Sequence, residues 1–317
     1  MSTTRSVRVR ALAKINLDLR VLGKRPDGYH ELRTIFQTIS LADSLDIAFT
    51  PGRKTSIELD DPLAISDNLV VRAARMALDA MRVTGRVEMR LRKRIPMGAG
   101  LGGGSSDAAA VLLALPVLAG RALRLPALDL AELRDIAASL GSDVPFFLLG
   151  GAAVGIGRGT ELFPLPDRPA MAGLVVAPAA HVSTARAYRG LSPGLTTESQ
   201  ENKIISFQSI AWERGVGKSS ENDFEAIVFK QHRNLADLKR RLVRAGAAAA
   251  MMTGSGSALF GLFPNRHGIS AAMKLLGDEK VFRISLVSRA RYRQIWWRAL
   301  GPHAVRDTWP PQSRYAR

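Results

Sequence analysis

Apolar and polar residues alternate along residues 7–21, the pattern of a β-strand with one buried face. The apolar positions are Val7, Val9, Ala11, Ala13, Ile15, Leu17, Leu19 and Val21. The other face carries Arg10, Lys14, Asn16 and Asp18, with Leu12 as the apolar exception. Residues 24–28 then predict a turn, because Pro and Gly favour turns, and a second strand is expected to end near residue 41.

The remaining pattern predicts a mixture of strands and helices. Strands are expected at 55–59, 87–92, 173–177 and 258–263. Helices are expected at 69–81, from Ser105 or Ser106 onward, and at 126–140, 224–229, 235–245 and 269–276. A glycine-rich hairpin is expected at 150–159, and residues 191–220 show the least pattern.

The length of 317 residues is enough for two domains with their own cores. Pro164, Pro166 and Pro169 mark a plausible boundary between them. The expected division is 1–165, 166–288 and a basic, aromatic extension at 289–317. No apolar stretch is expected to span a bilayer, since Pro116 interrupts the longest one.

Composition and charge restrict the chemistry. The chain has no cysteine, which excludes disulfides and thiolate sites and suits a reducing cytoplasm. A net charge of +17 indicates anionic partners without choosing among them. The extension mixes arginines with Tyr292, Trp296, Trp297, Trp309 and Tyr315. Such a mixture can stack on single-stranded nucleic acid, or it can be a solvated or packed tail.

Residues 98–106 form a loop of glycines and serines between a predicted strand and a predicted helix. Backbone N–H groups in such a loop and at a helix start bind anions. A dinucleotide fold would need an acidic residue about 20 positions later, and a Walker loop would need a lysine where Gly104 stands. The loop is therefore expected to be a phosphate loop of another kind. The alternative for the loop is a turn that binds no ligand. The alternative for Ser105 and Ser106 is that they only cap the helix.

Residues 95–109, Ile-Pro-Met-Gly-Ala-Gly-Leu-Gly-Gly-Gly-Ser-Ser-Asp-Ala-Ala, resemble the central motif of the GHMP kinases. Residues 13–17, 27–32 and 141–147 resemble the branch that phosphorylates 4-diphosphocytidyl-2-C-methyl-D-erythritol in non-mevalonate isoprenoid biosynthesis, and residues 253–257 resemble its third glycine-rich motif. The resemblance spans residues 8 to about 288. It implies an α+β, two-domain fold, with an ATP-binding domain like ribosomal protein S5 followed by a ferredoxin-like α/β sandwich.

The resemblance also assigns roles to residues that have ordinary explanations when taken alone. Lys14 and Asn16 could be a solvated strand edge, and Asp143 could be a turn cap. The resemblance implies that Asp143 is the catalytic carboxylate and Lys14 the cation beside it, a pairing suited to phosphoryl transfer. It further implies that Asn16, Tyr29, His30 and Tyr188 bind substrate. For Tyr29 and His30 the alternative is packing within a hairpin.

For ATP, the resemblance implies that Asn68 and Lys93 lie near the adenine. The expected triphosphate loop is Pro96, Met97, Gly98, Ala99, Gly100, Leu101, Gly102, Gly103, Gly104, Ser105 and Ser106. Mg²⁺ is expected to accompany ATP and to contact Ser106. The expected activity is ATP-dependent phosphorylation of the 2-hydroxyl of the cytidine diphosphate sugar alcohol by a cytoplasmic monomer or homodimer, with neither nucleic acid nor membrane as partner. The alternatives are a GHMP kinase for another alcohol and a basic nucleic-acid-binding protein on a degenerate kinase fold.

Overall fold

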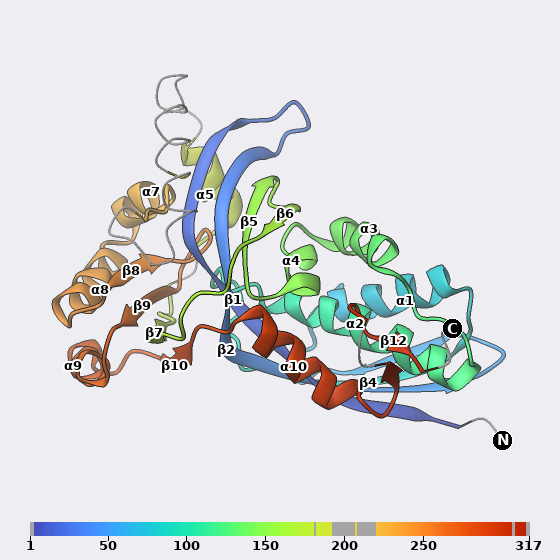
Figure 1. The fold of residues 1–317 in the computed structure, drawn as a ribbon. Coiled ribbons are helices and arrows are strands. Elements are labelled where there is room, and N and C mark those ends of the chain that lie inside the picture. The colour runs from blue at the N-terminus through green and yellow to red at the C-terminus, as the bar shows by residue number, and fades with distance from the viewer. Residues whose placement is uncertain (1–2, 181, 192–206, 208–219, 306–307, 315–317) are drawn as a thin grey trace.

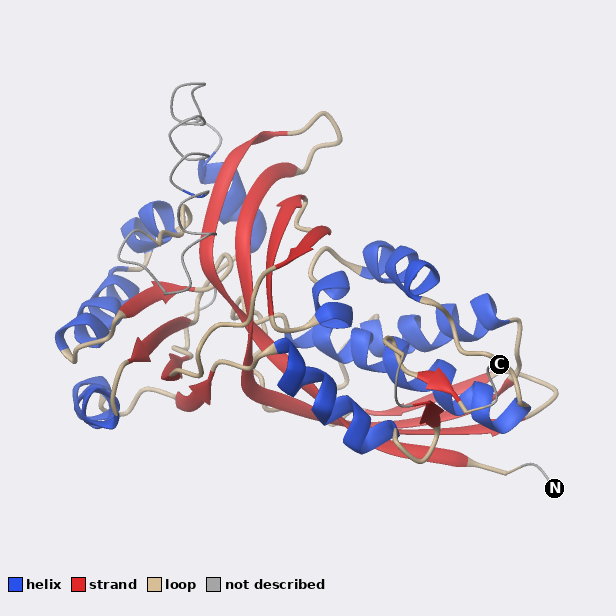
Figure 2. Ribbon diagram, viewed as in Figure 1, coloured by secondary structure: helices blue, strands red, loops and turns tan. Residues whose placement is uncertain are grey.

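The computed structural model describes the whole chain except residues 1–2, 181, 192–206, 208–219, 306–307 and 315–317 (Figure 1). The described part contains two larger sheets with helices packed on them (Figure 2). The predicted mixed α and β content is confirmed. The prediction for residues 191–220 lies almost wholly outside the described residues.

The first sheet has six strands in the order β3-β4-β2-β5-β6, with β1 paired to β2. Its strands are β1 (Arg5–Lys24), β2 (His30–Pro51), β3 (Ser56–Asp60), β4 (Gly85–Arg92), β5 (Ala152–Gly157) and β6 (Glu161–Pro164). The helices that follow these strands are α1 (Leu69–Met81), α2 (Gly103–Leu123), α3 (Leu130–Leu140) and α4 (Val144–Leu149).

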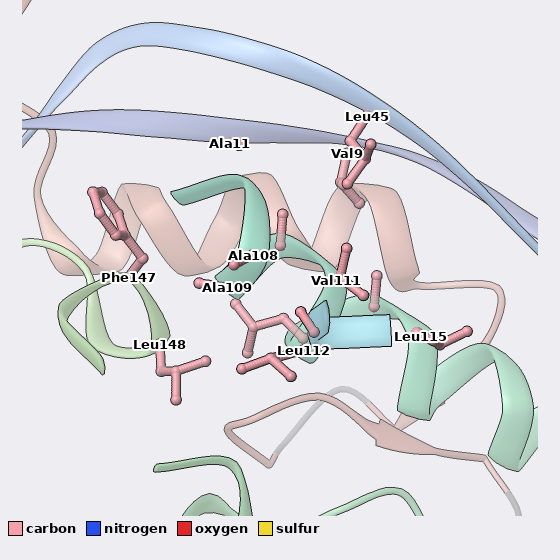
Figure 3. Packing of buried hydrophobic residues seen from close by; sticks show 14 of the residues in the cluster. Val9, Ala11, Leu45, Ala108, Ala109, Val111, Leu112, Leu115, Phe147 and Leu148 are labelled. Carbon is pink, nitrogen blue, oxygen red and sulfur yellow. The ribbon is translucent and has the colours of Figure 1, made fainter. Parts of the chain in front are cut away.

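Helix α2 is the centre of the first core. It packs against β1 and β2 on one side and against α1, α3 and α4 elsewhere. Figure 3 shows Val111 on the side of α2 toward Val9 and Leu45 of the strands, and Leu112 on the side toward Leu148. Contrary to expectation, α2 is long and apolar enough to cross a membrane, but 83% of its most apolar stretch is buried inside the protein. Its hydrophobicity is explained by this burial.

The second sheet has four strands in the order β10-β7-β9-β8. They are β7 (Ala172–Val176), β8 (Ala249–Met252), β9 (Leu259–Phe263) and β10 (Val281–Ser285). The helices beside it are α5 (Thr184–Leu191), α7 (Glu225–Gln231), α8 (Arg233–Arg244) and α9 (Arg266–Leu276). Leu235, Leu238 and Leu242 give α8 an apolar face that packs on this sheet.

Strand β1 runs through both parts of the molecule, as Figure 1 shows. Leu12 lies in the first core, while Ala13 and Ile15 lie in a second cluster and Val21 in a third. Irregularities in the pairing with β2 accompany these changes of core. The prediction of a half-buried strand is therefore wrong from Ala11 onward, because both faces of β1 are covered there.

Several boundaries differ from those predicted. Strand β2 continues to Pro51 instead of ending near residue 41, because it pairs with β4 over its last part. Helix α3 starts after Asp129, whose side chain forms a capping box with Glu132, so the helix begins later than predicted. Elements β8, β10, α5 and α10 were not predicted.

The end of the chain returns to the first core. It forms α10 (Arg289–Leu300) and the small sheet of β11 (Ala304–Val305) and β12 (Gln312–Ser313). Figure 1 shows these elements beside α2 and β1, and α10 contacts β1 while β12 contacts α2. Tyr292 and Trp296 are 1% and 2% exposed. These two rings cannot stack on nucleic acid, so the packed-tail alternative is confirmed for them; Tyr315 lies outside the described residues.

Candidate active site

Two cavities meet at the glycine-rich loop. The larger has a volume of about 820 Å³, and its lining includes all six residues predicted for catalysis and substrate binding: Lys14, Asn16, Tyr29, His30, Asp143 and Tyr188. The smaller, about 360 Å³, is lined by the loop, Asn68 and Lys93. Gly98 and Gly100 line both cavities. A nucleotide in one and an acceptor in the other would therefore meet at the loop.

Lys14 and Asp143 lie together in the larger cavity. The Lys14 Nζ is 3.4 Å from an Asp143 carboxylate oxygen, and their side chains are 4% and 32% exposed. Asp143 occupies the position before α4, where Pro145 favours the first turn of a helix. A buried ammonium thus faces a carboxylate that remains accessible from the cavity. The predicted convergence of the two side chains is observed.

Asn16 holds Lys14 in place. Its Oδ1 accepts hydrogen bonds from Lys14 Nζ at 2.8 Å and from the Gly254 backbone N–H at 2.9 Å. Its Nδ2 donates to Thr34 Oγ1 at 2.7 Å. Asn16 is 1% exposed, so the solvated-edge alternative is wrong for it and for Lys14, which is 3% exposed.

The glycine-rich loop is fixed on both sides. The Leu101 carbonyl accepts from the Lys14 backbone N–H at 3.0 Å, and the Ala99 carbonyl accepts from the Ala258 N–H at 3.2 Å. Gly100 has φ +76°, and a Cβ there would lie 2.1 Å from the Thr253 carbonyl oxygen. Only glycine fits both the dihedral angle and the space. The loop is therefore joined to β1 and to the third glycine-rich motif at the same time.

Lys93 is held in a buried cluster of charges beside the smaller cavity. Its Nζ donates to Asp43 Oδ2 at 2.5 Å and to Asp107 Oδ2 at 2.7 Å. Burial raises the pKa of Asp107 to about 7, against the opposing effect of Lys93. Burial also opposes the charge of Lys93, but the two carboxylates raise its pKa overall. Asp43 and Asp107 were not predicted, because the three residues are far apart in sequence and only folding brings them together.

Asn68 caps α1, where its side chain accepts from the Val70 N–H at 3.0 Å and donates to Asp61 at 3.0 Å. It lines the smaller cavity as expected. Ser106 does not line it: the Ser106 hydroxyl is buried and donates to the Leu12 carbonyl at 2.7 Å. The expected contact of Ser106 with Mg²⁺ stays a prediction, and Ser105 is the loop hydroxyl that lines the cavity.

The far end of the larger cavity is aromatic. The rings of His30 and Tyr188 lie 4.7 Å apart, and Tyr188 packs edge-on against Phe224 at 4.8 Å. Tyr29 is 50% exposed, with the Arg158 guanidinium 3.5 Å from its ring centre. Burial, and then the charge of Lys24, lower the pKa of His30. Burial, and then Asp143, raise the pKa of Tyr188 to about 12. The imidazole is therefore neutral at pH 7 and the phenol keeps its proton.

The geometry agrees with comparisons to known proteins. The model of the GHMP kinases N terminal domain matches residues 68–151, and that of the GHMP kinases C terminal region matches residues 207–275. A 4-diphosphocytidyl-2-C-methyl-D-erythritol kinase of Solibacter usitatus (strain Ellin6076) is 70% identical over 319 residues, covering 99% of each chain. The chain belongs to this kinase family. A 4-diphosphocytidyl-2-C-methyl-D-erythritol kinase of Pelotomaculum thermopropionicum (strain DSM 13744 / JCM 10971 / SI) is 41% identical. The match covers 80% of this chain and 87% of the relative.

Solved structures support the family assignment. A crystal structure of 4-(cytidine 5'-diphospho)-2C-methyl-D-erythritol kinase matches with a TM-score of 0.72 and 37% identity, covering 88% of this chain and 98% of its own. A homoserine kinase from Cytophaga hutchinsonii ATCC 33406 matches with a TM-score of 0.68 at 17% identity, covering 90% and 95%, which shows the shared fold. The two-domain GHMP kinase fold is confirmed. The expected end of the resemblance near residue 288 is wrong for the Solibacter relative, which matches almost the whole chain.

Proposed function

We propose that this chain transfers the γ-phosphoryl group of ATP to the 2-hydroxyl of 4-diphosphocytidyl-2-C-methyl-D-erythritol. The observation that supports the proposal most strongly is the Lys14–Asp143 pair in a cavity that shares Gly98 and Gly100 with the loop cavity. The choice of substrate is supported by the 70% identical relative, which is named 4-diphosphocytidyl-2-C-methyl-D-erythritol kinase.

In the proposed step, the substrate oxygen bonds to the γ-phosphorus while the bond to the β–γ bridging oxygen breaks and ADP leaves. Asp143 orients the hydroxyl and accepts its proton. Lys14 stabilises that carboxylate and the negative charge on the transferring group, as phosphoryl transfer depends chiefly on position and electrostatics. Asn16 keeps the ammonium aimed at the reacting oxygens through its 2.8 Å hydrogen bond.

The aromatic end of the cavity supports recognition of the cytosine. The neutral His30 ring offers both a donor and an acceptor for the edge of the base. Tyr29 and Tyr188 offer ring faces, and stacking of a base on an aromatic ring contributes about 1–3 kcal/mol. Lys24, Arg158 and Arg189 also line this cavity and suit the diphosphate of the substrate.

The smaller cavity is proposed to hold ATP, with Asn68 and Lys93 toward the adenine. Among the described residues there is no cluster of three His, Asp or Glu side chains suited to a metal. The donor set fits Mg²⁺ that arrives with ATP, because this ion is held mainly by phosphate and water oxygens. Ser105 is the loop hydroxyl in position to add one ligand. Bound Mg²⁺ would neutralise phosphate charge during transfer.

A substrate panel tests the proposal. ADP formation is measured with the cytidylylated sugar alcohol, with the same sugar alcohol phosphate lacking cytidine, and with homoserine and mevalonate. The proposal expects turnover with the first compound and far lower kcat/KM with the others. Equal turnover of an alcohol without cytidine would instead support another GHMP kinase activity, and salt-sensitive oligonucleotide binding without ATP turnover would support the nucleic-acid alternative.

A further inference from the structure

The carboxy-terminal segment, meaning the described residues from Arg289 to Arg314, makes two hydrogen bonds to α4. The Tyr292 hydroxyl donates to the Phe147 carbonyl at 2.5 Å, and Trp309 Nε1 donates to the Leu148 carbonyl at 2.9 Å. The last carbonyls of a helix have no partner within it. Two of these carbonyls in α4 are therefore satisfied by side chains from a segment about 145–161 positions later.

The contact is closely fitted. A Cβ on Gly150 would lie 2.3 Å from the Tyr292 ring, and a Cβ on Gly151 would lie 2.7 Å from Arg289. Arg289 also donates to the Ala152 carbonyl at 2.5 Å. Gly150 and Gly151 therefore have no space for a side chain, because Tyr292 and Arg289 of this segment occupy it.

Helix α4 connects the segment to the reaction site. Its six residues begin directly after Asp143. A Cβ on Gly102 would lie 2.8 Å from the Phe147 ring, so the same helix also contacts the glycine-rich loop. A shift of α4 would move Asp143 relative to Lys14 and relative to the loop.

We propose that Tyr292 and Trp309 are positioning residues that hold Asp143 at its reacting position through the carbonyls of α4. The inference rests on the proposed function, because it assumes that Asp143 takes part in transfer. It gives the extension a role in turnover beyond packing. Misplacement of a reacting group by about 1 Å can lower a rate by about 10²-fold, so a small shift of a short helix is enough.

The test compares Tyr292→Phe with Gln312→Leu in the full chain. Tyr292→Phe keeps the ring and removes the hydroxyl that binds α4. Gln312→Leu is the matched control, because Gln312 Nε2 donates at 3.0 Å to the Leu128 carbonyl, which lies outside α4. Both variants are expected to lower Tm by a few degrees. Only Tyr292→Phe is expected to lower kcat, by about tenfold, with the KM for ATP unchanged.

Trp309→Phe supplies a second variant in case Tyr292→Phe does not fold, and it is expected to lower kcat in the same way. A double-mutant cycle separates positioning from general destabilisation. In an Asp143→Asn background, Tyr292→Phe should leave the residual rate unchanged. A further tenfold loss there would overturn the proposal, as would kcat values for Tyr292→Phe and Trp309→Phe equal to that of Gln312→Leu. An inactive wild-type chain would contradict the proposed function itself.

Discussion

Asn16 of β1 is hydrogen-bonded to Thr253, which directly follows β8. The Asn16 backbone N–H donates to Thr253 Oγ1 at 3.1 Å, and that hydroxyl lies 3.2 Å from Asn16 Oδ1, to which it can donate. Thr253 is fully buried. The residue that orients Lys14 is therefore fixed by the third glycine-rich motif, so the site depends on contact between the two parts of the chain.

Replacing Thr253 with Val is expected to weaken this contact. The variant keeps the shape of the side chain but leaves the buried Asn16 N–H without its acceptor, which costs about 1–3 kcal/mol. The free energy of unfolding, measured by urea titration, should fall by that amount, and kcat should fall as Asn16 loosens. Thr253→Ser retains the hydroxyl and is the control. Equal stability of the Val and Ser variants would show that the hydrogen bond contributes nothing.

Replacing Asp143 with Ala is expected to remove most turnover while ATP binding changes little. The loss should be about 10²–10⁴-fold in kcat, the usual contribution of a positioned acid or base. Stopped-flow or coupled assays give kcat, and calorimetry gives the Kd for ATP. Asp135→Ala, on the exposed face of α3, is the control. A near-normal kcat for Asp143→Ala would remove this carboxylate from the mechanism.

Replacing His30 with Ala is expected to raise the KM for the cytidine-bearing substrate by about tenfold or more, because the variant loses both the ring contact and the edge contacts to the base. The KM for ATP should stay unchanged. His267→Ala, an exposed histidine on α9, is the control. If the KM values for both substrates rise together, His30 supports the fold and does not recognise the base.

The lowered pKa of His30 predicts a pH dependence for the same substrate. The ordinary pKa is 6.5, and burial places that of the folded protein below it. The neutral ring is thus the main form above pH 6.5, and the KM for the cytidine substrate should change little there. As pH falls through the lowered pKa, the ring gains a proton and KM should rise. A His30→Ala variant should lack this rise.

Local pattern was enough to predict most helices and strands, and the family motifs were enough to predict which side chains meet. Lys14 and Asn16 were placed on one face because they are two apart on a strand, but their burial follows from the second sheet, which pattern alone could not position. Tyr292 and Trp309 were recognised as aromatic residues of the extension, but their contacts could not be predicted. Their partners in α4 are set by tertiary packing. Sequence alone did not predict that Ser105 lines the smaller cavity while Ser106 does not, because two adjacent serines at a helix start look alike in sequence.

The buried cluster of Lys93, Asp43 and Asp107 gives a prediction about stability. The Lys93 side chain is 9% exposed, and Lys93→Met would leave two carboxylates without their cation. Removing one partner of a buried ion pair costs about 3–5 kcal/mol. The free energy of unfolding should fall by about this amount at pH 7. Arg92→Met, an exposed residue on β4, is the control and should have little effect.

The raised pKa of Asp107 gives this cluster a characteristic pH dependence. The unfolded carboxyl has a pKa near 3.8, while the folded one has a pKa of about 7. Between these values the folded protein retains a proton that the unfolded chain has lost, so the free energy of unfolding should decrease as pH rises from about 4 to about 7. Asp107→Asn cannot lose that proton, and its stability should fall less steeply over the same range. Urea titrations at several pH values measure both slopes, and identical slopes would show that Asp107 is ionised throughout.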